Sequence, residues 1–323
     1  EPRKASQLLE MAVNIYKIRQ ETSNKGGKFQ FGFSFYGGPR FKDYSKIGLE
    51  IKKHLKSANG PSIRFIESKE KNLSSVIVGK ESLLTKGADL VIVKTVDGYY
   101  LGVTLTAQDW SCYSARDYGR PYRNNKQGLL PPKLAQIMIN LSQMPAGGKL
   151  LDPFCGSGTV LQEALFLGYQ KLIGSDLAAP AIEQTRNNLQ WLKTKYNLNI
   201  NNIQLYQLDA RALSAEIQNS SVDAIVSEPY LGESKKSQDL SQNLADLSAL
   251  YFNAFKEFYK VLKTGGRAVF IFPIIAGRKC EILGKIKKIG FLQENLSPSE
   301  RGTVVYQRPG QIVLREIAVF VKR

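Results

Sequence analysis

A glycine-containing turn between an apolar run and a helical pattern constrains the fold of this chain most. Residues 150–159 read Leu-Leu-Asp-Pro-Phe-Cys-Gly-Ser-Gly-Thr, and residues 160–165 continue with helical character. A strand, a glycine turn and a helix N-terminus form a cradle in which backbone N–H groups and the helix dipole face one ligand. The turn lacks the lysine of the phosphate loop and does not fit G-x-G-x-x-G. A tight strand–helix turn without a ligand is the alternative.

Strand and helix patterns alternate from residue 149 onward. Helices are expected over 131–141, 178–196, 245–262 and 280–289, and strands over 149–152, 171–176, 203–208, 222–226, 267–272, 291–296 and 312–321. Residues 231–243 are polar and predict a loop, and Gly265 and Gly266 are expected to end the helix before them. The alternation predicts an α/β fold with a mostly parallel, doubly wound sheet that has helices on both faces.

The first third of the chain has a different pattern. Helices are expected over 5–20 and 44–55, and short strands over 29–35, 62–66, 75–78, 89–94 and 99–106. This pattern predicts a small α+β domain, in which nothing looks catalytic. We therefore expect a first domain over 1–107, a linker over 108–130 and a second domain over 131–323. The chain starts at Glu1 rather than at methionine, so the sequence leaves open whether a preceding segment completes the first domain.

Composition narrows the partners and the chemistry. The 323 residues fit two domains, and a net charge of +17 favours a polyanionic partner such as a nucleic acid, although a basic surface that only aids solubility is the alternative. Three widely spaced cysteines and a single histidine, His54, support neither a disulfide framework nor a metal site. No apolar run reaches the roughly 18 residues of a membrane span. We expect a cytoplasmic protein without metal or membrane attachment.

Polar residues fall at the expected carboxyl ends of four successive strands: Asp152, Asp176, Asp209 and the run 227–230. Ligands of open α/β sheets bind at this edge. Asp176, with Leu177, is placed to accept hydrogen bonds from ribose hydroxyls, or else to cap a turn. Asp209, with Ala210, is placed for an adenine amine, or else as a helix N-cap.

Aromatic residues and three arginines are interleaved between residues 109 and 123. Such groups suit contacts with a flipped base and with a nucleic-acid backbone. Packing of this segment on its neighbouring domains is an equally good alternative. The residues predicted to contact a substrate are Arg116, Arg120, Arg123 and Lys133.

The run D-P-F-C-G-S-G-T at 152–159 resembles motif I of S-adenosylmethionine (SAM) dependent amino-methyltransferases. The resemblance implies that Asp152, Pro153, Phe154, Cys155, Gly156, Ser157, Gly158 and Thr159 hold the methionine end of SAM. In such enzymes the fourth strand ends in D/N-P-P-Y/F, whose acceptors align the amine while the aromatic ring stacks on the flipped base. Here the tetrapeptide is Ser227-Glu228-Pro229-Tyr230. A hydroxyl replaces the usual Asp/Asn, and Glu228 offers a main-chain carbonyl and its own carboxylate as proton acceptors.

Beyond these motifs, Arg120-Pro121-Tyr122-Arg123, the run 130–135 and the runs 306–311 and 315–317 resemble the tRNA guanine-10 N2-methyltransferase family. The resemblance implies a Rossmann-like class I methyltransferase domain behind a THUMP-like RNA-binding domain, with tRNA as substrate and the exocyclic N2 amine of guanosine as the target. The alternatives are a DNA amino-methyltransferase and a non-catalytic RNA-binding protein with a degenerate S-E-P-Y motif. Neither the modified nucleotide, the number of methyl groups, the oligomeric state nor an accessory protein is readable from the sequence.

Overall fold

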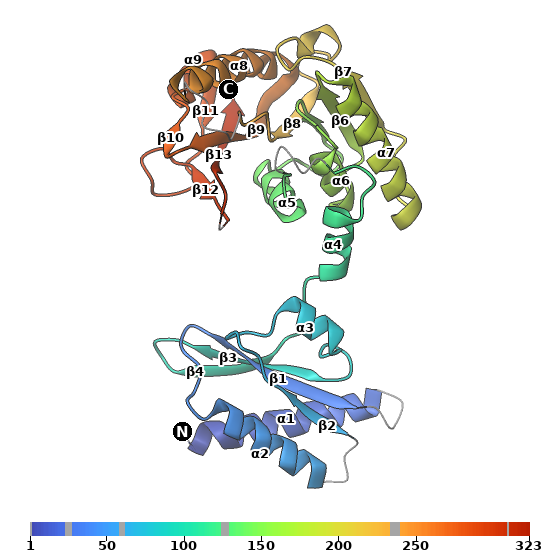
Figure 1. Cartoon of the computed structure of the whole chain (residues 1–323), viewed down its shortest axis with the longest axis vertical. Helices are drawn as coiled ribbons and strands as arrows, with labels where there is room; N and C mark the ends of the chain where they lie inside the picture. Colours follow the sequence, from blue (N-terminus) through green and yellow to red (C-terminus); the bar gives the residue numbers. More distant parts are fainter. Residues whose placement is uncertain (1, 23–27, 58–61, 124–128, 233–239, 309) are drawn as a thin grey trace. The chain divides into compact units, whose positions relative to one another are not determined.

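The structure is a computed structural model that describes residues 2–22, 28–57, 62–123, 129–232, 240–308 and 310–323. The chain divides into two compact units, Glu1–Cys112 and Tyr113–Arg323 (Figure 1). The boundary lies inside the segment 108–130 that we expected to be a linker. Each unit has its own sheet and its own core.

The first unit is an α+β domain built on a four-stranded sheet of order β2-β1-β3-β4. Strand β1 pairs in parallel with β2 and β3, and β4 pairs antiparallel with β3. The period-two phenylalanines of β1, beginning at Phe29, are buried in one core with helices α1 and α2. The elements are α1 (Pro2–Thr22), β1 (Phe29–Tyr36), α2 (Tyr44–Ser57), β2 (Ile63–Ile66), α3 (Ser75–Lys80), β3 (Ala88–Lys94) and β4 (Tyr99–Val103).

One expected strand of this unit, 75–78, is wrong. The segment is helix α3, whose N-cap Ser74 accepts a hydrogen bond from the backbone N–H of Ile77 at 3.3 Å. Three consecutive β-branched residues favour a strand locally. The cap and the burial of Val78 against Leu73 and Leu83 override that preference.

The second unit contains a nine-stranded sheet with the main order β11-β13-β9-β8-β5-β6-β7. Neighbours from β7 to β9 pair in parallel, and β13 runs antiparallel to both β9 and β11. The predicted doubly wound, mostly parallel sheet is confirmed. The elements are α4 (Trp110–Tyr118), which crosses the boundary, α5 (Pro132–Leu141), β5 (Lys149–Asp152), α6 (Thr159–Phe166), β6 (Lys171–Asp176), α7 (Ala179–Tyr196), β7 (Ile203–Gln207), β8 (Val222–Ser227), α8 (Leu240–Val261), β9 (Leu262–Ile275), β10 (Arg278–Lys279), α9 (Leu283–Ile289), β11 (Phe291–Gln293), β12 (Val304–Tyr306) and β13 (Val313–Lys322).

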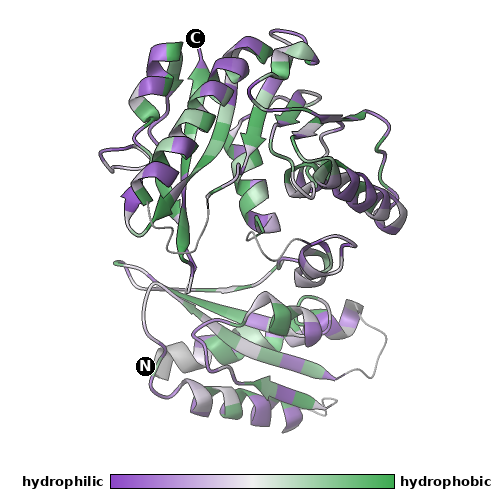
Figure 2. Cartoon of the chain, turned by 45° about the horizontal axis from the view of Figure 1, so that its top comes forward, coloured by the Kyte–Doolittle hydropathy of each residue, from purple (hydrophilic) through white to green (hydrophobic). Residues whose placement is uncertain are grey.

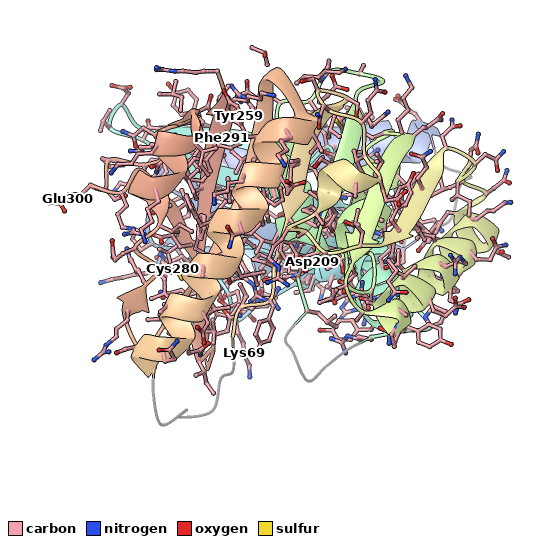
Figure 3. All side chains as sticks on the ribbon, turned by 90° about the horizontal axis from the view of Figure 1, so that it is seen from above. Lys69, Asp209, Tyr259, Cys280, Phe291 and Glu300 are labelled. Carbon is pink, nitrogen blue, oxygen red and sulfur yellow. The ribbon has the colours of Figure 1, made fainter. Side chains whose placement is uncertain are left out.

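Helices cover both faces of this sheet because successive strand residues point to opposite sides. Leu150 and Ala224 pack with α5, α6 and α7, whereas Leu151 and Ile225 pack with α8 and α9. Figure 2 shows the strands as mostly hydrophobic and the flanking helices as mixed. At the β11 edge of the sheet, Tyr259 of α8 lies beside Phe291 of β11 (Figure 3), with ring centroids 5.4 Å apart.

Several expected boundaries in this unit are wrong. Strand β9 begins at Leu262, directly after α8, so Gly265 and Gly266 lie inside the strand rather than past a helix end. Gly265 has a φ of +78°, and the pairing of β8 with β9 shifts register nearby. The helix expected from 280 begins at Leu283, and the sequence did not predict α4, β10 or β12. Of the expected loop 231–243, residues 233–239 lie outside the described residues, and α8 has begun by 240.

The order of the strands places the candidate site. Strand β5 lies between β6 and β8, so the chain passes to one side of β5 for β6 and β7 and to the other for β8 and β9. Ligands of open α/β sheets bind at such a switch point. Within the described residues, no helix is long and apolar enough to cross a membrane, and no group of three potential metal ligands comes together.

Candidate active site

The glycine turn forms the cradle that its sequence predicts. Gly158, with a φ of +84°, precedes the first residue of α6, and a Cβ there would lie 3.0 Å from Thr185 Cγ2. Gly156 has a φ of +53°, but no heavy atom lies within 4 Å of the position of its Cβ. The turn is therefore closely packed behind Gly158 and open at Gly156. The first N–H groups of α6 have no partners within the helix, which makes this end an anion-binding pole.

Side chains behind the cradle hold its carbonyl groups. Thr185 Oγ1 donates to the carbonyl of Gly156 at 2.7 Å, and Asn188 Nδ2 donates to that of Ser157 at 2.9 Å. Gln162 Nε2 donates to the carbonyl of Gly158 at 3.0 Å. Three successive carbonyl oxygens are thus bonded to α6 and α7. These bonds occupy the carbonyl groups of the turn and leave the N–H groups at the start of α6 available to a ligand.

Two further acids at strand ends differ in what they contact. Asp176 accepts hydrogen bonds from the N–H groups of Gly156 and Ala178, both at 3.0 Å, so it caps a turn and also touches the cradle. Asp209 binds Arg211 at 2.6 Å, and this hydrogen bond holds the pKa of its carboxyl below the usual range despite partial burial. Leu177 is exposed and Ala210 is buried. Their predicted contacts with ribose and adenine stay predictions.

Asp152 and Ser227 meet at the ends of the neighbouring strands β5 and β8. Ser227 Oγ donates to Asp152 Oδ1 at 2.5 Å, and the N–H of Phe154 donates to the same oxygen at 3.3 Å. The Asp152 residue is 2% exposed. Burial raises the pKa of its carboxyl to about 7, the nearby Asp176 and Glu228 add to the rise, and the two hydrogen bonds oppose it.

The side chain of Glu228 is held in a buried ion pair. Its Oε1 accepts a hydrogen bond from Arg315 Nε at 2.5 Å, and Arg315 Nη2 also donates to the carbonyl of Leu129 at 3.4 Å. Burial raises the pKa of the Glu228 carboxyl, while the charge of Arg315 opposes that rise. The contacts indicate that this carboxylate fixes the turn onto β13, rather than accepting a substrate proton as we expected from sequence.

Tyr230 combines a fixed backbone with an accessible ring. Its carbonyl accepts a hydrogen bond from the hydroxyl of the buried Tyr251 of α8 at 2.5 Å. The residue itself is 47% exposed. Pro229 is buried, so the tetrapeptide ends with the proline ring in the interior and Tyr230 at the surface. This arrangement suits stacking on a planar group.

The four basic residues predicted to contact a substrate lie in different environments. Arg116 is buried and binds Glu163 with two hydrogen bonds of 2.7 and 3.1 Å, which indicates a structural role instead. Arg120 is also buried and donates to Thr159 Oγ1 at 2.7 Å. Arg123 lies over the ring of Tyr118, and Lys133 is exposed. Only Arg123 and Lys133 are placed at a surface.

Sequence reasoning missed the residues that support the site from a distance. Asn188, Tyr251 and Arg315 lie on three later elements, and each bonds to a motif that the sequence identified. Asn188 had a usable signal, since it lies on the same helical face as the apolar Leu189 and Leu192. A polar side chain on a buried face needs hydrogen-bond partners. Tyr251 had no such signal, and Arg315 was identified only within the run 315–317 of the family resemblance, without its partner Glu228.

Comparison with known proteins agrees with this geometry. The family model described as "RMKL-like, methyltransferase domain" matches residues 120–276. The crystal structure of TrmN from Thermus thermophilus covers 99% of this chain, and the chain covers 78% of that structure, with a TM-score of 0.57. The two are 19% identical, so this likeness concerns the fold.

Three similar proteins carry closely related names. The tRNA (guanine(10)-N2)-dimethyltransferase of Methanothermobacter thermautotrophicus is 37% identical over 41% of this chain and 37% of its own length. That of Methanocaldococcus jannaschii is 31% identical over 72% of this chain and 62% of its own length. The probable tRNA (guanine(10)-N2)-dimethyltransferase of Methanothermococcus thermolithotrophicus is 35% identical over 36% of this chain and 72% of its own length.

The chain thus spans less than two thirds of the length of the first two relatives. The family model, over residues 120–276, includes both the cradle at 152–159 and the tetrapeptide at 227–230. The chain belongs to the tRNA guanine-10 N2-methyltransferase family.

Proposed function

We propose that this chain is a SAM-dependent methyltransferase that acts on the exocyclic N2 amine of a guanosine in tRNA. One observation carries the proposal: the ends of β5 and β8 bring the glycine cradle and the Ser-Glu-Pro-Tyr tetrapeptide together, through the hydrogen bond from Ser227 to Asp152. A cofactor site and an amine-binding motif thereby share one edge of the sheet. The names of the relatives supply the guanosine and position 10.

The residues of the cradle fit SAM. The space beside Gly156 and the N–H pole of α6 suit the methionine end, which residues 152–159 would hold. Asp176 and Leu177 would contact the ribose, and Asp209 and Ala210 the adenine. Bound SAM would supply an activated methyl group on a positively charged sulfur. No metal is needed for such a transfer.

The protein contributes alignment rather than covalent chemistry. An exocyclic amine of a base is a weak nucleophile because its lone pair is conjugated with the ring. Ser227 Oγ and the main-chain carbonyl of Glu228 would accept hydrogen bonds from the amine, and Tyr230 would stack on the flipped base. Because Ser227 donates its own proton to Asp152, its oxygen presents lone pairs toward any further donor.

We assign recognition of the RNA to positively charged side chains and to the first unit. The net charge of +17 favours a polyanion, and we assign Arg123 and Lys133 to phosphate contacts. We also propose that the first unit is a THUMP-like RNA-binding domain. Cys112, Cys155 and Cys280 are free thiols, which is consistent with the cytoplasmic location proposed for a tRNA-modifying enzyme.

Transfer of a labelled methyl group from SAM to unmodified tRNA, with duplex DNA as a competing substrate at matched salt, tests this function. Tyr230→Ala should lower kcat/KM for tRNA by about 10- to 100-fold, because stacking on a base is worth about 1–3 kcal/mol. Leu292→Ala, on the edge strand β11, is the control. Preferred transfer to DNA, or no transfer by protein that binds both SAM and tRNA, would contradict the proposal.

A further inference from the structure

Arg120 has a buried guanidinium group that lacks a charged partner. The residue is 4% exposed, and its Nε and Nη2 atoms have no hydrogen-bond partner in the part of the chain that the structure describes. Among the described residues, Nη1 of Arg120 donates a hydrogen bond to Thr159 Oγ1 at 2.7 Å. Burying a charge without a counter-charge lowers the stability of the folded protein. Such a group is therefore expected to bind an anionic ligand or an acidic side chain in the working protein.

The other two arginines of the same segment have partners. Arg116 forms two hydrogen bonds with Glu163, the shorter at 2.7 Å, and Arg123 lies 4.0 Å from Asp117. Burial lowers the pKa of Arg120, and the more distant Asp117 and Glu163 only partly oppose this effect. Arg120 is therefore not one more structural ion pair. Its surroundings are suited to an anion that arrives from outside.

The position of this guanidinium group is fixed against the cradle. Thr159, which it contacts, is the first residue of α6, so the group lies at the positive end of that helix. Asn188 exchanges two hydrogen bonds with the backbone of Tyr122, of 3.0 and 2.9 Å, and also donates to the carbonyl of Ser157. One side chain thus joins the segment that carries Arg120 to the glycine turn.

We propose that Arg120 binds the carboxylate of the amino-acid portion of SAM, together with the N–H groups at the start of α6. This inference rests on the proposed function, because it takes SAM as the occupant of the cradle. A carboxylate matches the two guanidinium nitrogens that lack partners and the helix pole beside them. A phosphate of the RNA backbone is the other anion of this system. The guanidinium group contacts Thr159 of the cradle itself, which favours the small ligand.

Calorimetry with two thioether ligands tests the proposal without any turnover. The ligands are S-adenosylhomocysteine and its decarboxylated analogue, which keeps the ammonium group and lacks only the carboxylate. The wild-type protein should bind the first about 10- to 100-fold more tightly, as expected for hydrogen bonds to a charged group. Arg120→Met should lose this preference and bind the analogue as the wild type does. Arg120→Gln, which keeps a donor for Thr159, should give the same result.

Arg186→Gln is the matched control, since it removes one positive charge from an exposed ion pair on α7 and should keep the preference. A preference that survives in both Arg120 variants would overturn the proposal, as would equal weakening of both ligands. Loss of tRNA affinity with an intact preference would assign Arg120 to an RNA phosphate and also overturn it. If the wild type binds neither ligand, the proposed function itself fails.

The stability of the ligand-free protein gives an independent measurement. Removal of a structural arginine destabilises a protein, whereas removal of a buried charge that awaits a ligand does not. Ligand-free Arg120→Met should therefore unfold at the same temperature as the wild type or at a higher one, while S-adenosylhomocysteine raises its melting temperature less. A lower melting temperature without ligand, together with an unchanged shift on adding ligand, would overturn the assignment.

Discussion

Ser227 Oγ donates a hydrogen bond of 2.5 Å to Oδ1 of Asp152, and the two side chains are buried at the ends of adjacent strands. This bond joins the carboxyl end of β8, the fourth strand of the domain in sequence, to that of β5, the first. In the amino-methyltransferase motif that the tetrapeptide resembles, Asp or Asn stands at the position of Ser227. A carboxylate at that position would place two acids in contact with each other, which a hydroxyl avoids. The hydroxyl at the end of β8 thus contacts a buried acid at the end of β5.

Ser227→Ala should destabilise the protein, because it removes the shorter of the two hydrogen bonds to the buried carboxylate of Asp152. We expect the free energy of unfolding to fall by about 1–3 kcal/mol at pH 8, measured by denaturant titration. Ser175→Ala is the control, since that hydroxyl is buried on β6 and has no partner among the described residues. Equal effects of the two substitutions would show that the bond to Asp152 contributes little.

The raised pKa of Asp152 predicts an unusual dependence of stability on pH. The folded pKa is about 7, and the value in unfolded chains is about 3.9. Between these values the folded state binds the proton more tightly than the unfolded state, so this group destabilises the fold progressively as the pH rises from about 4 to 7 and has no further effect above that.

We therefore expect Asp152→Asn to gain stability relative to the wild type as the pH rises from about 5 to 8. The difference between the two melting temperatures, measured without ligand across this range, isolates Asp152 from every other titrating group. A difference that does not change with pH would show that the carboxyl group titrates normally.

The buried pair of Glu228 and Arg315 should show strong coupling. Each of Glu228→Leu and Arg315→Met leaves one buried group uncompensated and should cost about 3–5 kcal/mol of unfolding free energy. The double variant Glu228→Leu/Arg315→Met should recover most of this loss, because it removes both charges from the interior.

An exposed ion pair, measured in a double-mutant cycle of its own, provides the comparison. Arg186 and Glu183 lie 2.8 Å apart on the surface of α7, and both side chains are 59% exposed. Their coupling energy should be about 0–1 kcal/mol. Similar coupling energies for the two pairs would mean that Glu228 and Arg315 are not held in the buried contact.

Asn188→Leu should loosen the segment that precedes the cradle. The substitution removes the side-chain hydrogen bonds to Tyr122 and Ser157, and should lower the free energy of unfolding by about 1–3 kcal/mol. It should also weaken the binding of S-adenosylhomocysteine. Gln190→Leu, two residues later and exposed on the same helix, should change neither quantity in titrations of both variants. Unchanged affinity in Asn188→Leu would separate this segment from the cofactor site.

Much of the methyltransferase domain could be predicted because its signals are local. Parallel strands buried on both faces leave apolar runs such as 224–226, and polar residues at their ends mark one edge of the sheet. The cradle could be located for the same reason, since its glycines and Asp152 are adjacent in sequence. Helix α3 shows the limit of local signals, because its cap and its packing outweigh three β-branched residues.

The support of the site could not be predicted because it joins distant residues. Glu228 and Arg315 are 87 positions apart, and Arg116 and Glu163 are 47 apart. Nothing in the local sequence of Arg116 distinguishes it from Arg120, although one is paired and the other is not. Which distant residues a side chain contacts depends on the order of the strands in the sheet, and the structure was needed to determine that order.

The nucleoside that becomes methylated tests the central claim most directly. Two unmodified tRNA transcripts, one with guanosine and one with inosine at position 10, would be incubated with the protein and SAM, digested and analysed by mass spectrometry. Inosine lacks only the N2 amine. We predict N2-methylated guanosine from the first transcript and no methylated nucleoside from the second. Equal methylation of the two transcripts, or a methyl group on another atom, would contradict the account.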